Sequence, residues 1–145
     1  MTQNWTTVIT NVVNVLKGIS GIEKVPLNPT ETANNTLMII VYPELGTIHN
    51  SPVGQRDADI AVMLLRRRID LATDFSVIIP YLDLIGTALK REVDPPTLTD
   101  PNAGGRFNNS IQVFTNTQWK YETLDYAGVQ WACYHFTMKD CVITV

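Results

Sequence analysis

Histidine and cysteine are scarce in this sequence, and long hydrophobic runs are missing from it. There are two histidines and two cysteines among 145 residues, and no run of about 18 apolar residues that could cross a membrane as a helix. Cys133 and Cys141 stand on one expected strand, where about 3.3 Å per residue places them about 26 Å apart, too far for a mutual disulfide. The chain also opens without a signal peptide. We therefore expect a soluble protein of the reducing cytosol with two buried thiols.

Motifs for catalysis and for metal binding are lacking too. Neither His49, in a loop flanked by proline and glycine, nor His135, inside an expected strand, has the spacing to a nucleophile that a catalytic triad needs. Cys133 and Cys141 share the strand of His135 without the short chelating turn of a zinc site. The glycine pair before Arg106 lacks the rest of a P-loop. We predict a protein that is not an enzyme, with no catalytic, cofactor-binding or metal-binding residues.

Length and charge set the broad class of the chain. Residues 1–145, of 16.2 kDa, are expected to form a single domain that can bury about 68–70% of its unfolded surface without metals or disulfides. A formal net charge of −3 gives no general attraction to nucleic acid or to an anionic membrane. Any contact with a polyanion must therefore be local.

Two segments have the periodicity of amphipathic helices. The first covers residues 5–19, with apolar side chains at Trp5, Val8, Ile9, Val12, Leu16 and Ile19. The second is expected from about residue 76 to residue 92, with one face formed by Ile78, Tyr81, Leu82, Ile85 and Leu89. Pro80 must then lie in or near the first turn, because deeper in a helix it would cost about 3 kcal/mol. Asp74 or Ser76 can cap this helix.

The first part of the sheet is expected between these helices. Residues 37–42 (LMIIVY) form an apolar run that ends at Pro43 and predicts a strand covered on both faces. Residues 58–65 lead directly into three arginines at positions 66–68, which predicts one long strand that leaves the core. Residues 44–57 are expected to be a long hairpin loop.

The second part follows a loop rich in proline, glycine and asparagine at residues 94–110, which we expect to be mobile until a partner orders it. Residues 111–115 predict a short strand. Residues 119–145 predict two strands joined at residues 125–128. These elements indicate an α+β fold: a single domain with a mixed or antiparallel sheet and two amphipathic helices packed on one face.

The last strand carries bulky side chains on both of its alternating faces, Trp131 and His135 on one, and Tyr134, Phe136 and Met138 on the other. A sheet with a solvated second face would show polar residues there. Something must therefore cover the second face.

Arginines and aromatic residues are the candidates for contact with partners: Arg66, Arg67, Arg68, Arg106, Trp119, Tyr121 and Trp131. Along a strand Arg66 and Arg68 share one face and Arg67 takes the other, so they form no helical stripe for phosphates. Three interpretations of the arginines at positions 66–68 stay open. They form a solvated strand end, they make ion pairs with a neighbouring chain, or they contact nucleic acid. The aromatics are either core residues or the centre of an interface.

In this order the elements resemble the tail terminator proteins of long-tailed bacteriophages (lambda-type). The likeness covers nearly the whole chain and rests on the N-terminal helix, LMIIVYP, AVMLLRRRID, DFSVIIPYLDLIGTALKRE, and the closing pair QWKYETLDYAG and VQWACYHFTMKDCVITV with its D-Y-x-G turn. The long loop at residues 94–110 departs from the family pattern.

The resemblance implies an α/β fold that assembles as a hexameric ring on the finished tail tube, ends polymerisation of the tube protein and offers a surface to the head connector. The implied partners are further copies of the chain, the tail tube protein, and a head-completion or connector protein. We further expect DNA to pass through the lumen without sequence-specific binding, and neither a membrane nor a cofactor to be involved. The protein would be part of the virion tail or neck, assembled in the host cytoplasm.

A ring also suggests what covers the second face of the sheet, because each protomer then meets a neighbour on either side. It further predicts that at least one arginine of residues 66–68 bridges protomers. A β-bulge near Gly128, which reverses the alternation, explains the second face without a partner. Other functions stay open: another neck or head completion protein of the virion, or a small α+β enzyme or ligand-binding domain.

Overall fold

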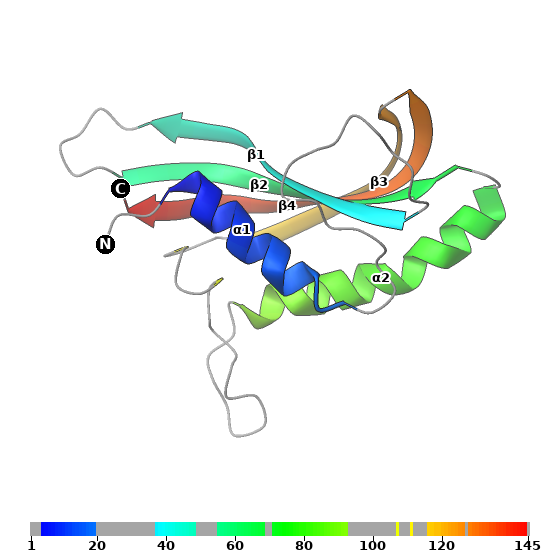
Figure 1. Cartoon of the computed structure of the whole chain (residues 1–145), viewed down its shortest axis with the longest axis horizontal. Coiled ribbons are helices and arrows are strands. Elements are labelled where there is room, and N and C mark those ends of the chain that lie inside the picture. Colours follow the sequence, from blue (N-terminus) through cyan, green and yellow to red (C-terminus); the bar gives the residue numbers. More distant parts are fainter. Residues whose placement is uncertain are drawn as a thin grey trace, which may run out of the picture.

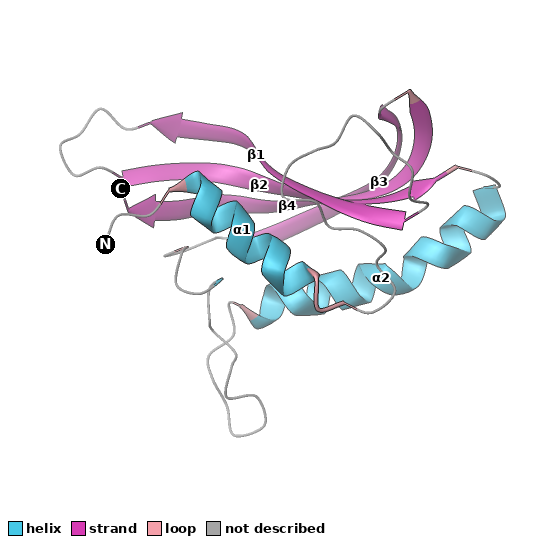
Figure 2. Cartoon of the chain, viewed as in Figure 1, coloured by secondary structure: helices cyan, strands magenta, loops and turns pink. Residues whose placement is uncertain are grey.

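A computed structural model describes residues 4–19, 37–48, 55–68, 71–92, 107, 111, 116–126 and 128–144. They contain two helices and four strands: α1 (Trp5–Leu16), β1 (Leu37–Ile48), β2 (Gln55–Arg67), α2 (Leu71–Arg91), β3 (Asn116–Tyr126) and β4 (Val129–Thr144). The strands form one antiparallel sheet in the order β1-β2-β4-β3. Both helices lie on the same face of this sheet (Figure 1; Figure 2). The α+β class and the antiparallel sheet are confirmed.

Helix α1 forms where the apolar periodicity predicts it. The side chain of Asn4 caps its first turn by accepting a hydrogen bond from the backbone N–H of Thr7 at 2.8 Å. The buried face carries Val8, Ile9, Val12, Val13 and Leu16. These side chains pack on the sheet and supply the stability that β-branched residues do not give a helix by themselves.

Helix α2 begins at Leu71, before the expected start at residue 76. The prediction that Pro80 lies near the first turn is therefore wrong, and Asp74 lies inside the first turn rather than capping it. Pro80 is exposed, whereas Ile78, Ile85 and Leu89 are fully buried. Burial of that face maintains the helix across the proline, an example of tertiary packing overriding a local preference.

Strand β1 continues through Pro43 to Ile48, so the prediction that residues 44–57 form a loop is wrong at both ends. Residues 49–54 lie outside the described part of the chain. The strand tolerates Pro43 because β1 is at an edge of the sheet and its register with β2 shifts between Pro43 and Leu45, leaving Glu44 as the extra residue.

The closing hairpin of β3 and β4 is confirmed, with Gly128 at φ 77° in its turn. No bulge lies near Gly128, because the register of β3 and β4 runs unbroken from Tyr126 opposite Val129 to Asn116 opposite Lys139. The alternation of inward and outward side chains in β4 reverses further along that strand, where its register with β2 shifts between Ala58 and Ile60. A bulge does occur, but at Lys139 and Asp140, so the predicted position is wrong.

Each face of the sheet carries a cluster of buried apolar side chains. The face under the helices contributes to a cluster with the buried residues of α1 and α2, which also includes Phe107 and Ile111. The second face carries a smaller cluster, Met38, Ile40, Met63, Leu65, Trp131 and Cys133. These six residues are at most 8% exposed within the single chain, so no neighbouring protomer is needed to cover them.

The predictions for residues 94–110 and 111–115 concern segments that lie almost wholly outside the described residues. Phe107 is fully buried, and its backbone N–H donates to Glu92 Oε2 at 3.0 Å. Ile111 is buried and belongs to no strand, and β3 begins only at Asn116.

Candidate functional site

The arginine run lies at the end of β2, where the strand leaves the core. Arg66 is directed to the helix side, and its Nε lies 3.3 Å from Oδ1 of Asp74, which is fully buried in the first turn of α2. Arg67 lies opposite Trp131 in β4, and the backbone N–H of Arg68 donates to the Gln130 carbonyl at 3.0 Å. The side chains of Arg67 and Arg68 are exposed. Arg66 therefore has an ion-pair partner within its own chain, whereas Arg67 and Arg68 face solvent.

The predicted aromatic candidates separate into two groups. Trp119 and Tyr121 are 54% and 36% exposed on β3. Trp131 is fully buried in the second-face cluster, as the core alternative predicted. Arg106, the remaining candidate, lies outside the described residues.

An aromatic cluster forms around Trp119 and Tyr121, and we call it the aromatic edge. The ring centroids of Trp119 and Tyr121 lie 5.7 Å and 5.8 Å from that of Tyr134 in β4. Phe75 of α2 joins it with its ring centroid 5.5 Å from that of Tyr121 in an edge-to-face contact. Burial, and then the nearby Tyr121, raise the pKa of Tyr134. Exposed aromatic groups of this kind are typical of protein–protein contacts.

Sequence reasoning missed Phe75. The available signal was the pair Phe75 and Ile79, two large apolar residues one turn apart but outside the core stripe of α2. Both are exposed, at 38% and 43%. They extend the apolar surface of the helix beyond its buried face.

A polar group of three residues lies on the second face of the sheet. His135 of β4 stands between Glu122 of β3, with Nδ1 3.0 Å from Oε1, and Glu44 of β1, with Nε2 3.4 Å from Oε2. Nε2 is buried and makes no hydrogen bond, so its approach to Glu44 is an ion pair only when the ring is protonated. A neutral ring can donate to one carboxylate, whereas a protonated ring has an N–H for each. The two carboxylates approach opposite nitrogens, which does not suit a single shared metal ion.

The cysteines are buried and unpaired by disulfides. Burial, and then the charge of Glu122, raise the pKa of Cys133 far above its ordinary value. Burial, and then the charge of Asp59, raise the pKa of Cys141 to about 12. Both groups are therefore thiols at neutral pH, the form with little nucleophilic reactivity.

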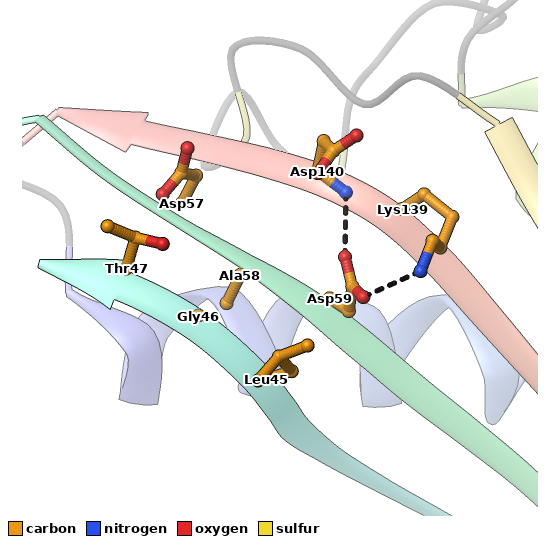
Figure 3. A pocket seen from close by; sticks show the side chains of 8 residues that line it. All are labelled: Leu45, Gly46, Thr47, Asp57, Ala58, Asp59, Lys139 and Asp140. Carbon is orange, nitrogen blue, oxygen red and sulfur yellow. Dashed lines mark hydrogen bonds and ion pairs between the residues drawn. The ribbon is translucent and has the colours of Figure 1, made fainter.

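The bulge in β4 lines a hollow of about 340 Å³ on the second face, between β1, β2 and β4 (Figure 3). Asp59 of β2 accepts from Lys139 Nζ at 2.9 Å and from the backbone N–H of Asp140 at 3.0 Å. Asp140 has φ 55°, which the bulge requires. Both oxygens of the Asp59 carboxylate thus accept hydrogen bonds from residues of the bulge, and these bonds stabilise its conformation.

The shifts in pKa agree with this role for Asp59. Burial alone would raise the pKa of its carboxyl, but the N–H of Asp140 and the Lys139 ammonium outweigh burial and lower it. The same ion pair raises the pKa of Lys139. Each partner therefore stabilises the charged form of the other.

Among the described residues, no group of three or more His, Cys, Asp or Glu side chains is arranged to hold a metal ion. No helix in the same residues is long and apolar enough to cross a membrane.

Comparison with known proteins adds no family. No protein-family profile matches the chain, and no curated protein matches it.

Proposed function

We propose that this protein is a structural phage assembly protein that caps the tail tube as a hexameric ring, stops tube polymerisation and provides the surface for head–tail joining. Its order of elements supports the proposal: a helix, two strands, a second helix and a closing hairpin, as in the resemblance drawn from the sequence. Its partners would be copies of itself, the tube protein and a connector, with DNA in the lumen.

The observation that carries the proposal is the exposure of apolar side chains at both edges of the sheet. Leu45 is 70% exposed on β1, and Trp119 is 54% exposed on β3. These strands are the two edges of the sheet, and their exposed side chains differ. A ring built head to tail needs two different surfaces on each protomer, one for each neighbour. Exposed Leu45 and the aromatic edge supply such a pair.

Deletion of the protein from its phage tests this function. We expect tails of uncontrolled length that fail to join heads, seen by electron microscopy of particles. Restoration by the wild type but not by Leu45→Asp or Trp119→Asp would support the two edges as ring contacts. Leu84→Asp is a matched control, because Leu84 is 48% exposed and belongs to α2 rather than to an edge strand. Normal tail lengths and normal joining after deletion would exclude the terminator function.

The same deletion experiment distinguishes a tail terminator from the alternative function, a neck or head completion protein. Loss of such a protein leaves tails of normal length that are not joined to heads. Measurement of tail length therefore distinguishes the two roles, whereas measurement of infectivity does not.

A further inference from the structure

Strand β3 offers an open edge for pairing. Within the described part of the chain its only strand neighbour is β4. Its side chains from Gln118 to Tyr121 are exposed, and those of Thr123 and Asp125 are exposed as well. An edge strand carries unpaired backbone N–H and C=O groups that can accept a further strand.

The opposite edge of the sheet is less suited to pairing. Strand β1 contains Pro43, which has no N–H, and its register shifts between Pro43 and Leu45. Its residues 37–41 are buried, in contrast to the exposed middle of β3. Proline and bulges are the usual devices that prevent pairing at an edge. The two edges therefore differ, and β3 is the one open to a further strand.

We propose that β3 pairs antiparallel with β3 of a second copy of this chain, about a two-fold axis through Tyr121. If the two strands overlap over their full length, Asn116 of one copy lies opposite Tyr126 of the other, and Tyr121 lies opposite itself. This same register places Lys120 opposite Glu122 of the second copy. Full overlap and charge complementarity therefore select one register.

The side chains on the two faces fit this register. On the second face, Lys120 and Glu122 of each copy form two symmetry-related ion pairs. They already lie 3.3 Å apart along their own strand, so all four charged groups would gather at the axis. On the helix face, Tyr121 meets its copy and Trp119 lies opposite Thr123. Opposite charges and aromatic pairs directly across strands both stabilise a sheet.

This pairing does not depend on the proposed function. A two-fold contact uses the same patch on both copies and is complete with two chains, whereas a ring joins two different patches. The two-fold pair would occupy the aromatic edge in the free protein. It is tested with purified protein, and the terminator function is tested in phage particles, so either can fail alone.

Reversal of charge tests the register. Purified wild type should sediment as a dimer that dissociates on dilution, and Lys120→Glu or Glu122→Lys should each raise the dimer dissociation constant at least about tenfold, because like charges then face each other. A mixture of the two variants should recover dimers, since each then opposes unlike charges. Lys90→Glu, an exposed change on α2, is the control and should dimerise as the wild type does. A monomeric wild type at about 100 μM, or variants with unchanged dissociation constants, would overturn the proposal.

A cross-link provides a second test that leaves Glu122 and its contact with His135 intact. Opposite residues in antiparallel strands have Cα atoms about 4.5–5.5 Å apart, within the range of a disulfide. Tyr121→Cys should therefore form a disulfide between two copies when copper phenanthroline accepts the two electrons and the two thiol protons are released. Thr123→Cys, exposed on the same face, should not, because its two copies would be offset by about 13 Å along the strands. Equal cross-linking of both variants, or none of either, would exclude this register.

Discussion

Among single residues, Arg66 and Asp74 form the contact that joins the sheet to the second helix. Asp74 is fully buried, and the guanidinium of Arg66 is its cationic partner at 3.3 Å. Removal of the cationic partner of a buried carboxylate is costly, because the desolvated negative charge loses that compensation.

We therefore expect Arg66→Gln to lower the free energy of unfolding by about 3 kcal/mol. Arg67→Gln is the matched control, because Arg67 is exposed one position along the same strand, and its effect should stay within about 0.5 kcal/mol. Unfolding in urea measures both values. Equal effects of the two substitutions would contradict a structural role specific to Arg66.

Asp59 is the second residue whose role follows from its contacts. Asp59→Asn should lower the free energy of unfolding by about 2 kcal/mol at pH 7, because two charge-assisted hydrogen bonds become weaker. Asp83→Asn on the exposed side of α2 is the control.

The pH dependence of this contribution has a definite sign. The folded-state pKa of Asp59 lies below the ordinary value of 3.8, so the unfolded chain binds a proton more readily. The stabilisation is fully present above about pH 5 and is lost as the pH falls through the folded-state pKa. The difference in stability between the wild type and Asp59→Asn should therefore shrink in acid, and a constant difference from pH 7 to pH 3 would contradict the assignment.

Among the elements, strands β1 and β2 approach closely at Gly46. A Cβ there would lie 2.7 Å from the Asp57 carbonyl oxygen and 2.9 Å from the Ala58 Cβ. We expect Gly46→Ala to destabilise the protein by about 1–3 kcal/mol, because backbone on the neighbouring strand must move.

Gly86 in α2 is the matched comparison, because a Cβ there would meet no atom within 4 Å. Gly86→Ala should stabilise the protein by about 0.5–1 kcal/mol through higher helix propensity. Thermal unfolding of the two variants should thus give shifts of opposite sign. A Gly46→Ala variant as stable as the wild type would contradict the close approach of the two strands, and a destabilised Gly86→Ala variant would contradict the open space at that position of α2.

For the whole molecule, we expect the exposed charges at the end of β2 to matter for the proposed assembly rather than for folding. Arg67 and Arg68 face solvent, so charge reversal at either should leave the free energy of unfolding within about 0.5 kcal/mol of the wild-type value. A single exposed ion pair contributes about 0–1 kcal/mol, but a ring repeats it in every protomer. We therefore expect Arg67→Glu or Arg68→Glu to reduce incorporation into tails.

Quantification of the protein in purified particles measures this effect, with Lys90→Glu as the control. Recovery by a reversed acidic residue on a neighbour would identify a bridge between protomers. A steep dependence on salt would instead indicate contact with DNA. Normal incorporation of both variants would show that these residues are a solvated strand end.

Several elements could be predicted from local pattern alone. The period of apolar residues in α1 and in the core face of α2 identifies both helices, and the continuous apolar runs identify β1 and β2. The start of α2, the passage of β1 through Pro43 and the bulge at Asp140 could not be predicted in this way. Each depends on contacts between elements, such as Arg66 of β2 with Asp74 of α2 or Asp59 of β2 with Asp140 of β4.

The residues of the candidate site also fall into two groups, those that the sequence could identify and those that only the tertiary structure reveals. Residue type and local pattern singled out Arg67, Trp119 and Tyr121, because arginines at the end of a strand and aromatics enriched at interfaces are visible in the sequence, whereas the edge position of β3 is not. The sequence by itself determined the α+β class and which side chains alternate along each strand. Only the tertiary structure decided that Trp131 is enclosed, that Arg66 is neutralised within the chain, and that Phe75 extends the aromatic edge. The physical reason is that burial and pairing depend on distances between elements, and local periodicity contains no information on those distances.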